Sequence, residues 1–232
     1  MALPYFFIQH LEEKKLQLDE DTSKHIINVL RMQKGEELLL TNGKGQKAKA
    51  QIIDDNRKRC VVEISETGSE AQSQPQVSIA ISITKNSSRF EWFLEKATEM
   101  GVNEIIPLLC ERTAKEKFRY ERMQGILVSA MLQSQQTWLP NLHQPTSFNE
   151  VVSGAAAAQK LIAHCLPEQK QQLSSLITHQ SSLILIGPEG DFTPAEITTA
   201  LAGGFTPVAL GNTRLRTETA GMVAAALLKI SF

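Results

Sequence analysis

The pattern of the chain changes near residue 70, and this change constrains the fold more than any other feature of the sequence. Up to residue 65, short strand-like runs are separated by turns, and Asn42-Gly43 favours a hairpin because both turn positions then need positive φ. The polar stretch 66–75 predicts a linker. Beyond it, apolar strands alternate with helical patterns, which indicates a mostly parallel sheet covered on both faces. We therefore expect a small β-barrel domain over residues 1–70 and an α/β domain over residues 75–232.

The first part also contains one short helical pattern. Asp21 opens it, and His25, Ile26, Val29 and Leu30 follow as its apolar positions. This spacing predicts a short helix with those four residues on its apolar face.

In the second part, local signals place the strands and helices more closely. Val77 to Thr84 alternates as a strand, and Ser88-Arg-Phe-Glu91 is a capping box that predicts the start of a helix ending near Gly101. Thr193-Pro-Ala-Glu196 is a second capping box, with proline at the first helical position. A final apolar helix is predicted from Thr217, as its N-cap, to Ile230.

Composition indicates a globular protein in a reducing compartment. The chain has 232 residues, of which 42% are hydrophobic and 21% charged, as in ordinary globular proteins. The three cysteines are far apart and have no C-x-x-C spacing, which favours reduced thiols and a cytoplasmic location. The longest apolar run, Met222 to Leu228, is too short to span a bilayer. The five histidines form no metal-binding motif, so we expect no metal site.

Charge is unevenly distributed along the chain. The formal net charge of the whole chain is −1, but residues 24–59 contain nine Lys and Arg against four acidic residues, a local charge of +5. A basic surface on a small β-domain can pair with nucleic-acid phosphates. A lysine-rich sheet face in solvent explains the same count, and charge alone slightly favours that simpler interpretation.

Two glycine-containing segments follow predicted strands. Gly187-Pro-Glu-Gly-Asp191 follows a buried strand, and strand ends in open α/β sheets are where ligands bind. It lacks a phosphate-binding glycine pattern, and its acidic residues suit a cationic or hydroxyl-rich ligand. The second segment runs from Gly211 to Ala220, and Arg216 precedes a helix start, where the helix dipole disfavours a cation. Such a local conflict is typical of functional sites. Either segment could also be an ordinary strand–helix turn.

A third segment, from Lys85 to Val102, contains Lys85, Arg89 and the sequence EKATEMGV. Taken alone it is typical of a solvated helix face with ion pairs. Together with GPEGD and LRTETA, however, it resembles the bacterial 16S rRNA uracil(1498)-N3-methyltransferase family, which belongs to the SPOUT superfamily of RNA methyltransferases. His25 to Arg31, Gly35 and the Asn42-Gly43 turn are similar to the PUA-like RNA-binding domain of that family.

The resemblance implies a fold, a cofactor and partners. It implies a SPOUT-type α/β domain with a trefoil knot, preceded by a PUA-like β-barrel, and a homodimer that uses S-adenosyl-L-methionine. The partner would be 16S rRNA or the small ribosomal subunit, with neither metal nor membrane involved. Two further interpretations stay open: another SPOUT RNA methyltransferase, acting on a ribose 2′-oxygen or a tRNA base, and a catalytically silent RNA-binding protein.

The resemblance also implies roles for individual residues. It implies catalytic roles for Arg216 and Glu218, without identifying the general base. The implied cofactor-binding residues are Leu185, Ile186, Gly187, Glu189, Gly190, Leu210, Gly211, Leu215, Arg216, Thr217, Thr219 and Ala220. The implied RNA-binding residues are Lys24, Arg31, Lys44, Lys47, Lys49, Lys85 and Arg89.

The chain departs from the family pattern at several positions. Asp191 stands where the family has a second glycine in GPEGG, and Asn212 and Thr213 stand where it often has arginine. Gln136 replaces an arginine ahead of a proline, and Tyr5 replaces an N-terminal arginine. These departures concern RNA contacts more than methyl transfer.

Overall fold

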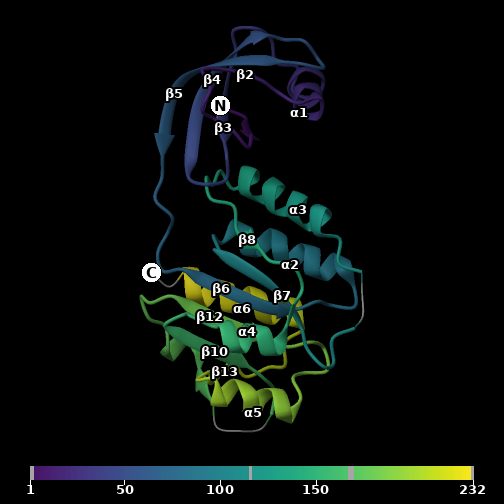
Figure 1. The fold of residues 1–232 in the computed structure, drawn as a ribbon, viewed down its shortest axis with the longest axis vertical. Helices are drawn as coiled ribbons and strands as arrows, with labels where there is room; N and C mark the ends of the chain where they lie inside the picture. The colour runs from purple at the N-terminus through teal and green to yellow at the C-terminus, as the bar shows by residue number, and fades with distance from the viewer. Residues whose placement is uncertain (1–2, 115–116, 167–169, 231–232) are drawn as a thin grey trace. The chain divides into compact units, whose positions relative to one another are not determined.

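The computed structural model describes residues 3–114, 117–166 and 170–230 (Figure 1). Its contacts divide the chain into two compact units. The first unit comprises Met1–Gln72 and Met131–Leu139, and the second comprises Ser73–Ala130 and Pro140–Phe232. No helix in the described part of the chain is both long and apolar enough to cross a membrane.

The first unit is built on a five-stranded sheet in the order β1-β3-β4-β5-β2. Its strands are β1 (Tyr5–Phe7), β2 (Lys15–Gln17), β3 (Glu37–Thr41), β4 (Gln46–Asp54) and β5 (Val61–Ser69). β1 runs parallel to β3, and the other neighbours are antiparallel. The side chains of Ile26, Leu38, Leu40, Ile52 and Val62 are almost completely buried and form the centre of its core.

The predicted hairpin between β3 and β4 is confirmed, but its turn is longer than two residues. Asn42 to Gly45 form the loop, and positive φ occurs at Gly43 (68°) and Gly45 (84°) rather than at Asn42. The Asn42 Oδ1 atom instead accepts hydrogen bonds from the backbone N–H groups of Lys44, at 2.9 Å, and Gln46, at 3.3 Å. The asparagine side chain therefore shapes the loop without adopting the left-handed conformation.

The short helix of the first unit differs from its prediction. α1 (Glu20–Lys24) is capped by Asp19, whose side chain accepts from Thr22 N, so the helix begins before Asp21. It continues as the π-helical turn η1 (His25–Val29). Of the four predicted apolar positions, Ile26 is buried and His25 is exposed, and Val29 and Leu30 are 66% and 43% exposed. The wider π turn explains this difference, because it rotates the later side chains away from the α-helical face.

Two other expectations for this unit were only partly right, although the boundary between the units, at Gln72 and Ser73, falls within the predicted linker. The predicted linker 66–75 begins inside β5, whose residues Glu66 to Ser69 pair with Gln46 to Lys49 of β4. In addition, the segment after helix α3 (Tyr120–Gln133) belongs to this unit: Gly45 N donates to Thr137 O at 2.8 Å, and Leu139 N donates to Gly43 O at 2.9 Å.

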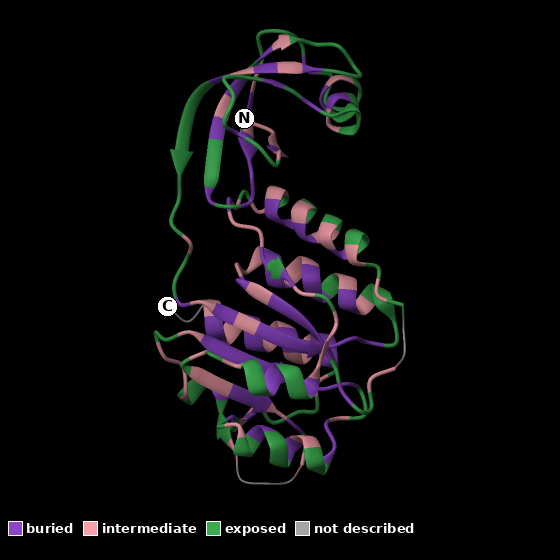
Figure 2. Ribbon diagram, in the orientation of Figure 1, coloured by how far each residue is buried: buried purple, intermediate pink, exposed green. Residues whose placement is uncertain are grey.

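The second unit contains a parallel sheet in the order β11-β13-β10-β12-β6-β7-β8, with β9 also paired to β7. Its strands are β6 (Val77–Ser82), β7 (Glu104–Leu109), β8 (Asn141–Leu142), β9 (Thr146–Ser147), β10 (Gln159–Ala163), β11 (Gln171–Gln172), β12 (Ser182–Ile186) and β13 (Thr206–Ala209). The central strands are buried on both faces, as Figure 2 shows for β6 and β12. This confirms the predicted parallel sheet with helices on both sides.

Helices cover the two faces of this sheet in pairs. α4 (Phe148–Gly154) and α5 (Pro194–Ala202) lie on one face, over a core that includes Phe148, Phe192 and Ile197. α2 (Ser87–Glu99) and α6 (Thr217–Ile230) pack together on the other face (Figure 1). A single-turn 3₁₀ helix, η2 (Leu173–Ser175), contacts α6.

The helix starts were predicted with mixed success. The capping box at Thr193 and Glu196 is confirmed. The capping box predicted at Ser88 is wrong, because Asn86 caps α2 by accepting from Ser88 N. Thr217, predicted as the N-cap of the last helix, is instead the first residue of α6, and its hydroxyl donates to Gly187 O at 3.1 Å, which links the helix start to another loop.

Candidate functional site

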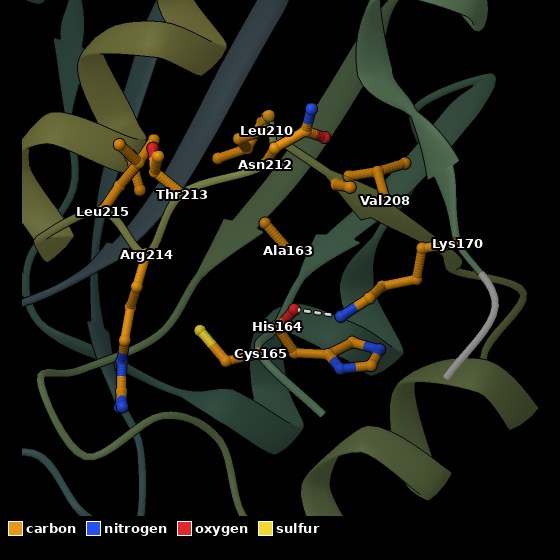
Figure 3. A pocket seen from close by; sticks show the side chains of 13 residues that line it. Ala163, His164, Cys165, Lys170, Val208, Leu210, Asn212, Thr213, Arg214 and Leu215 are labelled. Atoms are coloured by element: carbon orange, nitrogen blue, oxygen red, sulfur yellow. Dashed lines mark hydrogen bonds between the residues drawn. The ribbon is translucent and has the colours of Figure 1, made fainter. Parts of the chain in front are cut away.

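The carboxyl ends of three neighbouring strands define the site. β10 lies between β12 and β13 and is parallel to both, so the loops that follow these strands meet at one edge of the sheet. Two adjoining cavities of about 370 and 310 Å³ open there. Both are lined by Ala163, Cys165, Arg214, Leu215 and Ala220. Figure 3 shows Lys170 at one side of the larger cavity and Arg214 at the other, with Ala163 and Cys165 between them.

Asp191 joins two of the three loops. Its backbone is left-handed, with φ of 62°, which asparagine and aspartate tolerate better than most residues. Its carboxylate accepts from the backbone N–H of Phe192 at 2.9 Å and of Cys165 at 2.8 Å. The aspartate therefore keeps the backbone conformation that glycine adopts readily, and adds a tie to the loop after β10.

Other contacts fix the GPEGD loop from outside. The Arg112 Nη1 atom donates to Gly190 O at 2.7 Å, and the backbone N–H of Lys85 donates to Glu189 Oε1 at 3.1 Å. A Cβ atom on Gly187 would lie 3.1 Å from the Phe192 ring, so the strand end and the loop pack closely. Gly211, with φ of 121°, begins the other loop and has open space where a side chain would stand.

Arg216 and Glu218 lie in different environments. Arg216 is exposed and lines the smaller cavity. Glu218 is buried, and its Oε1 atom lies 3.7 Å from Nε of Arg89 on α2, whereas its Oε2 atom has no hydrogen-bond partner within the described residues. Of the two arginines, Arg89 is therefore the one within ion-pair distance of Glu218 in the described part of the chain.

The structure brings together most of the residues implied in cofactor binding. Nine of the twelve line one or both cavities: Ile186, Gly187, Glu189, Leu210, Gly211, Leu215, Arg216, Thr217 and Ala220. The other three do not: Leu185 is buried in β12, Gly190 contacts Arg112 through its carbonyl, and Thr219 is half-buried. Sequence reasoning missed the third loop, with Ala163, His164 and Cys165. The strand pattern that ends near His164 was the signal that could have indicated it.

The residues implied in RNA binding lie in both units, and several are paired with acids. Lys24 pairs with Glu20, Lys49 with Glu37 and Lys47 with Glu70. These partners hold the pKa of each lysine above its ordinary value. Arg31 is exposed in a left-handed conformation (φ 57°) at the end of η1, and Lys44 is exposed in the loop between β3 and β4. In the second unit, Lys85 is exposed beside the GPEGD loop.

Among the described residues, no three His, Cys, Asp or Glu side chains form a group that could hold a metal ion. The two cavities suit an organic molecule that carries apolar groups and charges of both signs. Leu210, Leu215 and Ala220 supply apolar contact. Glu189 and Asp191 carry negative charge, and Lys170, Arg214 and Arg216 carry positive charge. The volumes lie within the range of about 300–1,000 Å³ typical of small-molecule sites. These residues fit S-adenosyl-L-methionine, which has an adenine ring, ribose hydroxyls, a sulfonium and an amino-acid end.

Two family models match the chain. The RNA methyltransferase domain family matches residues 71–229, and the RNA methyltransferase PUA domain family matches residues 18–65. These matches, together with the parallel sheet and its strand-end cavities, define an RNA methyltransferase. A curated relative from Synechocystis, named ribosomal RNA small subunit methyltransferase E, is 35% identical over 210 residues, covering 87% of this chain and 68% of the relative. The chain belongs to the ribosomal RNA small subunit methyltransferase E family.

Solved structures agree with this assignment. A probable rRNA methyltransferase from Porphyromonas gingivalis is 39% identical and covers 96% of this chain and 95% of its own, with a TM-score of 0.91. A ribosomal RNA small subunit methyltransferase E from Neisseria gonorrhoeae, solved bound to S-adenosyl methionine, is 28% identical and covers 97% and 96%, with a TM-score of 0.86. The predicted α/β domain with a preceding PUA-like domain is thus confirmed. The trefoil knot stays a prediction.

Proposed function

We propose that this chain transfers a methyl group from S-adenosyl-L-methionine to N3 of uridine 1498 in the 16S rRNA of the small ribosomal subunit. The observation that carries the proposal is the pair of strand-end cavities, which nine of the twelve implied cofactor residues line. The names and the bound cofactor of the relatives support the reaction class and the RNA substrate.

Backbone groups and apolar side chains of the three loops would hold the cofactor, which when bound supplies an electrophilic methyl group on a sulfonium. The paired ties from Asp191 to Cys165 and from Thr217 to Gly187 set the loops in place before binding. Such prior ordering of a site lowers the entropy cost of binding. Holding two reactants in line could supply up to roughly 7–11 kcal/mol of barrier reduction.

Arg216 is proposed as a catalytic residue. Uracil N3 carries a proton in the neutral base, so negative charge develops on the ring as that nitrogen becomes nucleophilic. The exposed guanidinium at the wall of the smaller cavity can stabilise that charge on the uracil oxygens. The position of Glu218, buried beside Arg89, supports a positioning role instead: its carboxylate holds Arg89 at the start of α2.

The first unit is proposed to hold the rRNA. Arg31 and Lys44 are exposed and are the first candidates, whereas Lys24, Lys47 and Lys49 must exchange their acidic partners for phosphates. The resemblance further implies a homodimer and a cytoplasmic location, which we retain as parts of the proposal. Light scattering of the purified protein measures the dimer directly.

A methylation assay on small ribosomal subunits tests the function. Nucleoside mass analysis should show 3-methyluridine at one site, and the product should disappear in Arg216→Ala while that variant still binds S-adenosyl-L-methionine. A ribose-methylated nucleoside, or no product with either naked rRNA or subunits, would refute the proposed reaction. Full methyl transfer by Arg216→Ala would refute the role of that residue alone.

A further inference from the structure

A third cavity, of about 320 Å³, lies in the second unit outside the site described above. It is formed between the start of α2 and the segment that leads into α3. Thr84, Ser87 and Ser88 line it from the side of α2, and Lys117, Phe118 and Arg119 line it from the other. None of these residues lines the two strand-end cavities.

The charge of this cavity is positive. Lys117, Arg119 and Arg122 line it, with Glu91 as the single carboxylate in the lining. Arg122 holds Glu91 with two hydrogen bonds, of 2.6 Å from Nε and 2.8 Å from Nη2, and these bonds lower the pKa of that carboxyl. Because this acid is neutralised by one cation, Lys117 and Arg119 are left to attract an anion.

An aromatic ring stands beside these cations. Phe118 is half-buried and lines the cavity, and its ring packs edge-on against Phe90 at 6.1 Å and tilted against Tyr120 at 6.4 Å between centroids. The contacts hold the ring in one orientation while part of its surface stays accessible. A fixed aromatic ring next to lysine and arginine is the combination that binds a nucleobase and its phosphate in single-stranded RNA.

The segment between β6 and α2 connects this cavity to one of the cofactor loops. Thr84 lines the cavity, and the next residue, Lys85, donates its backbone N–H to Glu189, which lines the smaller strand-end cavity. The short segment between β6 and α2 therefore lines this cavity and also bonds to a residue that lines the smaller strand-end cavity. An RNA strand that places one nucleotide at the cofactor can therefore place a neighbouring nucleotide here.

We propose that this cavity binds a nucleotide of the RNA substrate that flanks the methylated one. Lys117 and Arg119 pair with its phosphate, and its base stacks on Phe118. The inference rests on the proposed function, since it assigns a second contact to the same substrate. It adds an RNA contact in the methyltransferase unit itself, at residues outside the basic segment 24–59.

The test measures RNA affinity and cofactor affinity separately. The double variant Lys117→Gln, Arg119→Gln should bind an rRNA fragment on the order of tenfold more weakly than wild type. The slope of log K against log salt concentration should become shallower by about one. Phe118→Leu keeps an apolar side chain and should weaken RNA binding by about fivefold or more through lost stacking. Calorimetry should show unchanged affinity of both variants for S-adenosyl-L-methionine, which excludes misfolding of the unit.

Lys96→Gln is the matched control. Lys96 lies on α2, whose start lines the cavity, but it pairs with Glu95 and Glu99 and does not line the cavity itself. This variant should bind RNA as wild type does. If it weakens RNA binding as much as the double variant, general charge explains the effect and the subsite is refuted.

A free nucleotide could present the same chemistry as an RNA strand, and uridine monophosphate separates the two. The proposal holds if the double variant loses RNA affinity and Lys96→Gln does not. It fails if RNA binding is unchanged while binding of uridine monophosphate is lost, because the cavity then serves a free nucleotide. It also fails if neither ligand is affected. If the wild-type protein methylates small-subunit rRNA but the variants bind RNA as tightly as wild type, the subsite is refuted. The proposed function is not affected by that result.

Discussion

Replacing Gly221 and Gly125 by alanine should change the stability of the second unit in opposite directions. Both glycines lie in helices of this unit, Gly221 in α6 and Gly125 in α3. Alanine is favoured over glycine inside a helix by about 1 kcal/mol, and this gain is the same at both sites. The surroundings of the added Cβ atom therefore decide the sign.

At Gly221 the added atom has no room. It would lie 2.7 Å from Cδ1 of Ile81 and 2.7 Å from Cε2 of Phe93, and both of those side chains are completely buried. Overpacking of this kind costs about 1–3 kcal/mol, so Gly221→Ala should be destabilised by about 1 kcal/mol after the helix gain. At Gly125 no atom lies within 4 Å, so Gly125→Ala should be stabilised by about 1 kcal/mol.

Urea unfolding followed by tryptophan fluorescence measures this difference. Trp92 lies in the second unit and Trp138 in the first, so a Trp138→Phe background reports the second unit alone. Thr217 and Ala220 of α6 line the strand-end cavity, so Gly221→Ala should also bind S-adenosyl-L-methionine several-fold more weakly, while Gly125→Ala binds it normally. If both alanines stabilise equally, α6 does not pack on β6 and α2 as closely as described and the reasoning is refuted.

Three further outcomes are expected. Asp191→Ala should lower the free energy of unfolding by about 2–3 kcal/mol, because two backbone donors lose a charged acceptor and the left-handed strain stays, whereas Asp191→Gly should lower it by about 1 kcal/mol less. Thermal unfolding compares the two variants, and a glycine variant more stable than wild type would contradict the hydrogen bond to Cys165. Of the three thiols, only that of Cys165, which is exposed, should react with iodoacetamide near pH 8, since burial raises the pKa of Cys60 to about 11 and of Cys110 to about 12. Because Cys165 lines the larger cavity, S-adenosyl-L-methionine should protect it, and mass spectrometry of the labelled protein identifies the modified residue. Burial lowers the pKa of Lys229, so between that lowered pKa and the ordinary value of 10.5 the unfolded chain binds more protons than the folded chain, and stability should rise with pH. Urea midpoints of wild type and of Lys229→Met, measured across this pH range, test the rise. Parallel pH profiles of the two proteins would disprove it.

The parts of the structure that sequence predicted best are those encoded by neighbouring residues. The capping box at Thr193 and Glu196 needs residues three apart, and it forms as expected. The two loops at Gly187 and Gly211 follow apolar strands, and both line the site. In each case the residues that determine the cap or the loop lie within about ten positions of one another, so a local sequence pattern is enough to predict it.

The charge pattern of residues 24–59 shows what a linear count leaves out. Its lysines are numerous, but Lys49 of β4 forms an ion pair with Glu37 of the neighbouring strand β3, and Lys47 is paired with Glu70 beyond the segment. A count along the chain includes Glu37 but cannot show which lysine it faces, and it omits Glu70 altogether. The exposed positive charge of the sheet is therefore smaller than the local value of +5 suggests.

The third loop of the site depended on strand order, which the sequence did not reveal. β10 precedes β12 and β13 in the chain, yet it lies between them in the sheet, so the residues after it complete a cavity that the later loops only partly enclose. Asp191 shows the consequence for a departure from the family pattern. On the sequence it replaces a glycine without an evident partner, but in the sheet its carboxylate faces the backbone N–H of Cys165. Because that partner comes from the loop after β10, the same strand order that conceals the third loop also explains why aspartate is tolerated at this position.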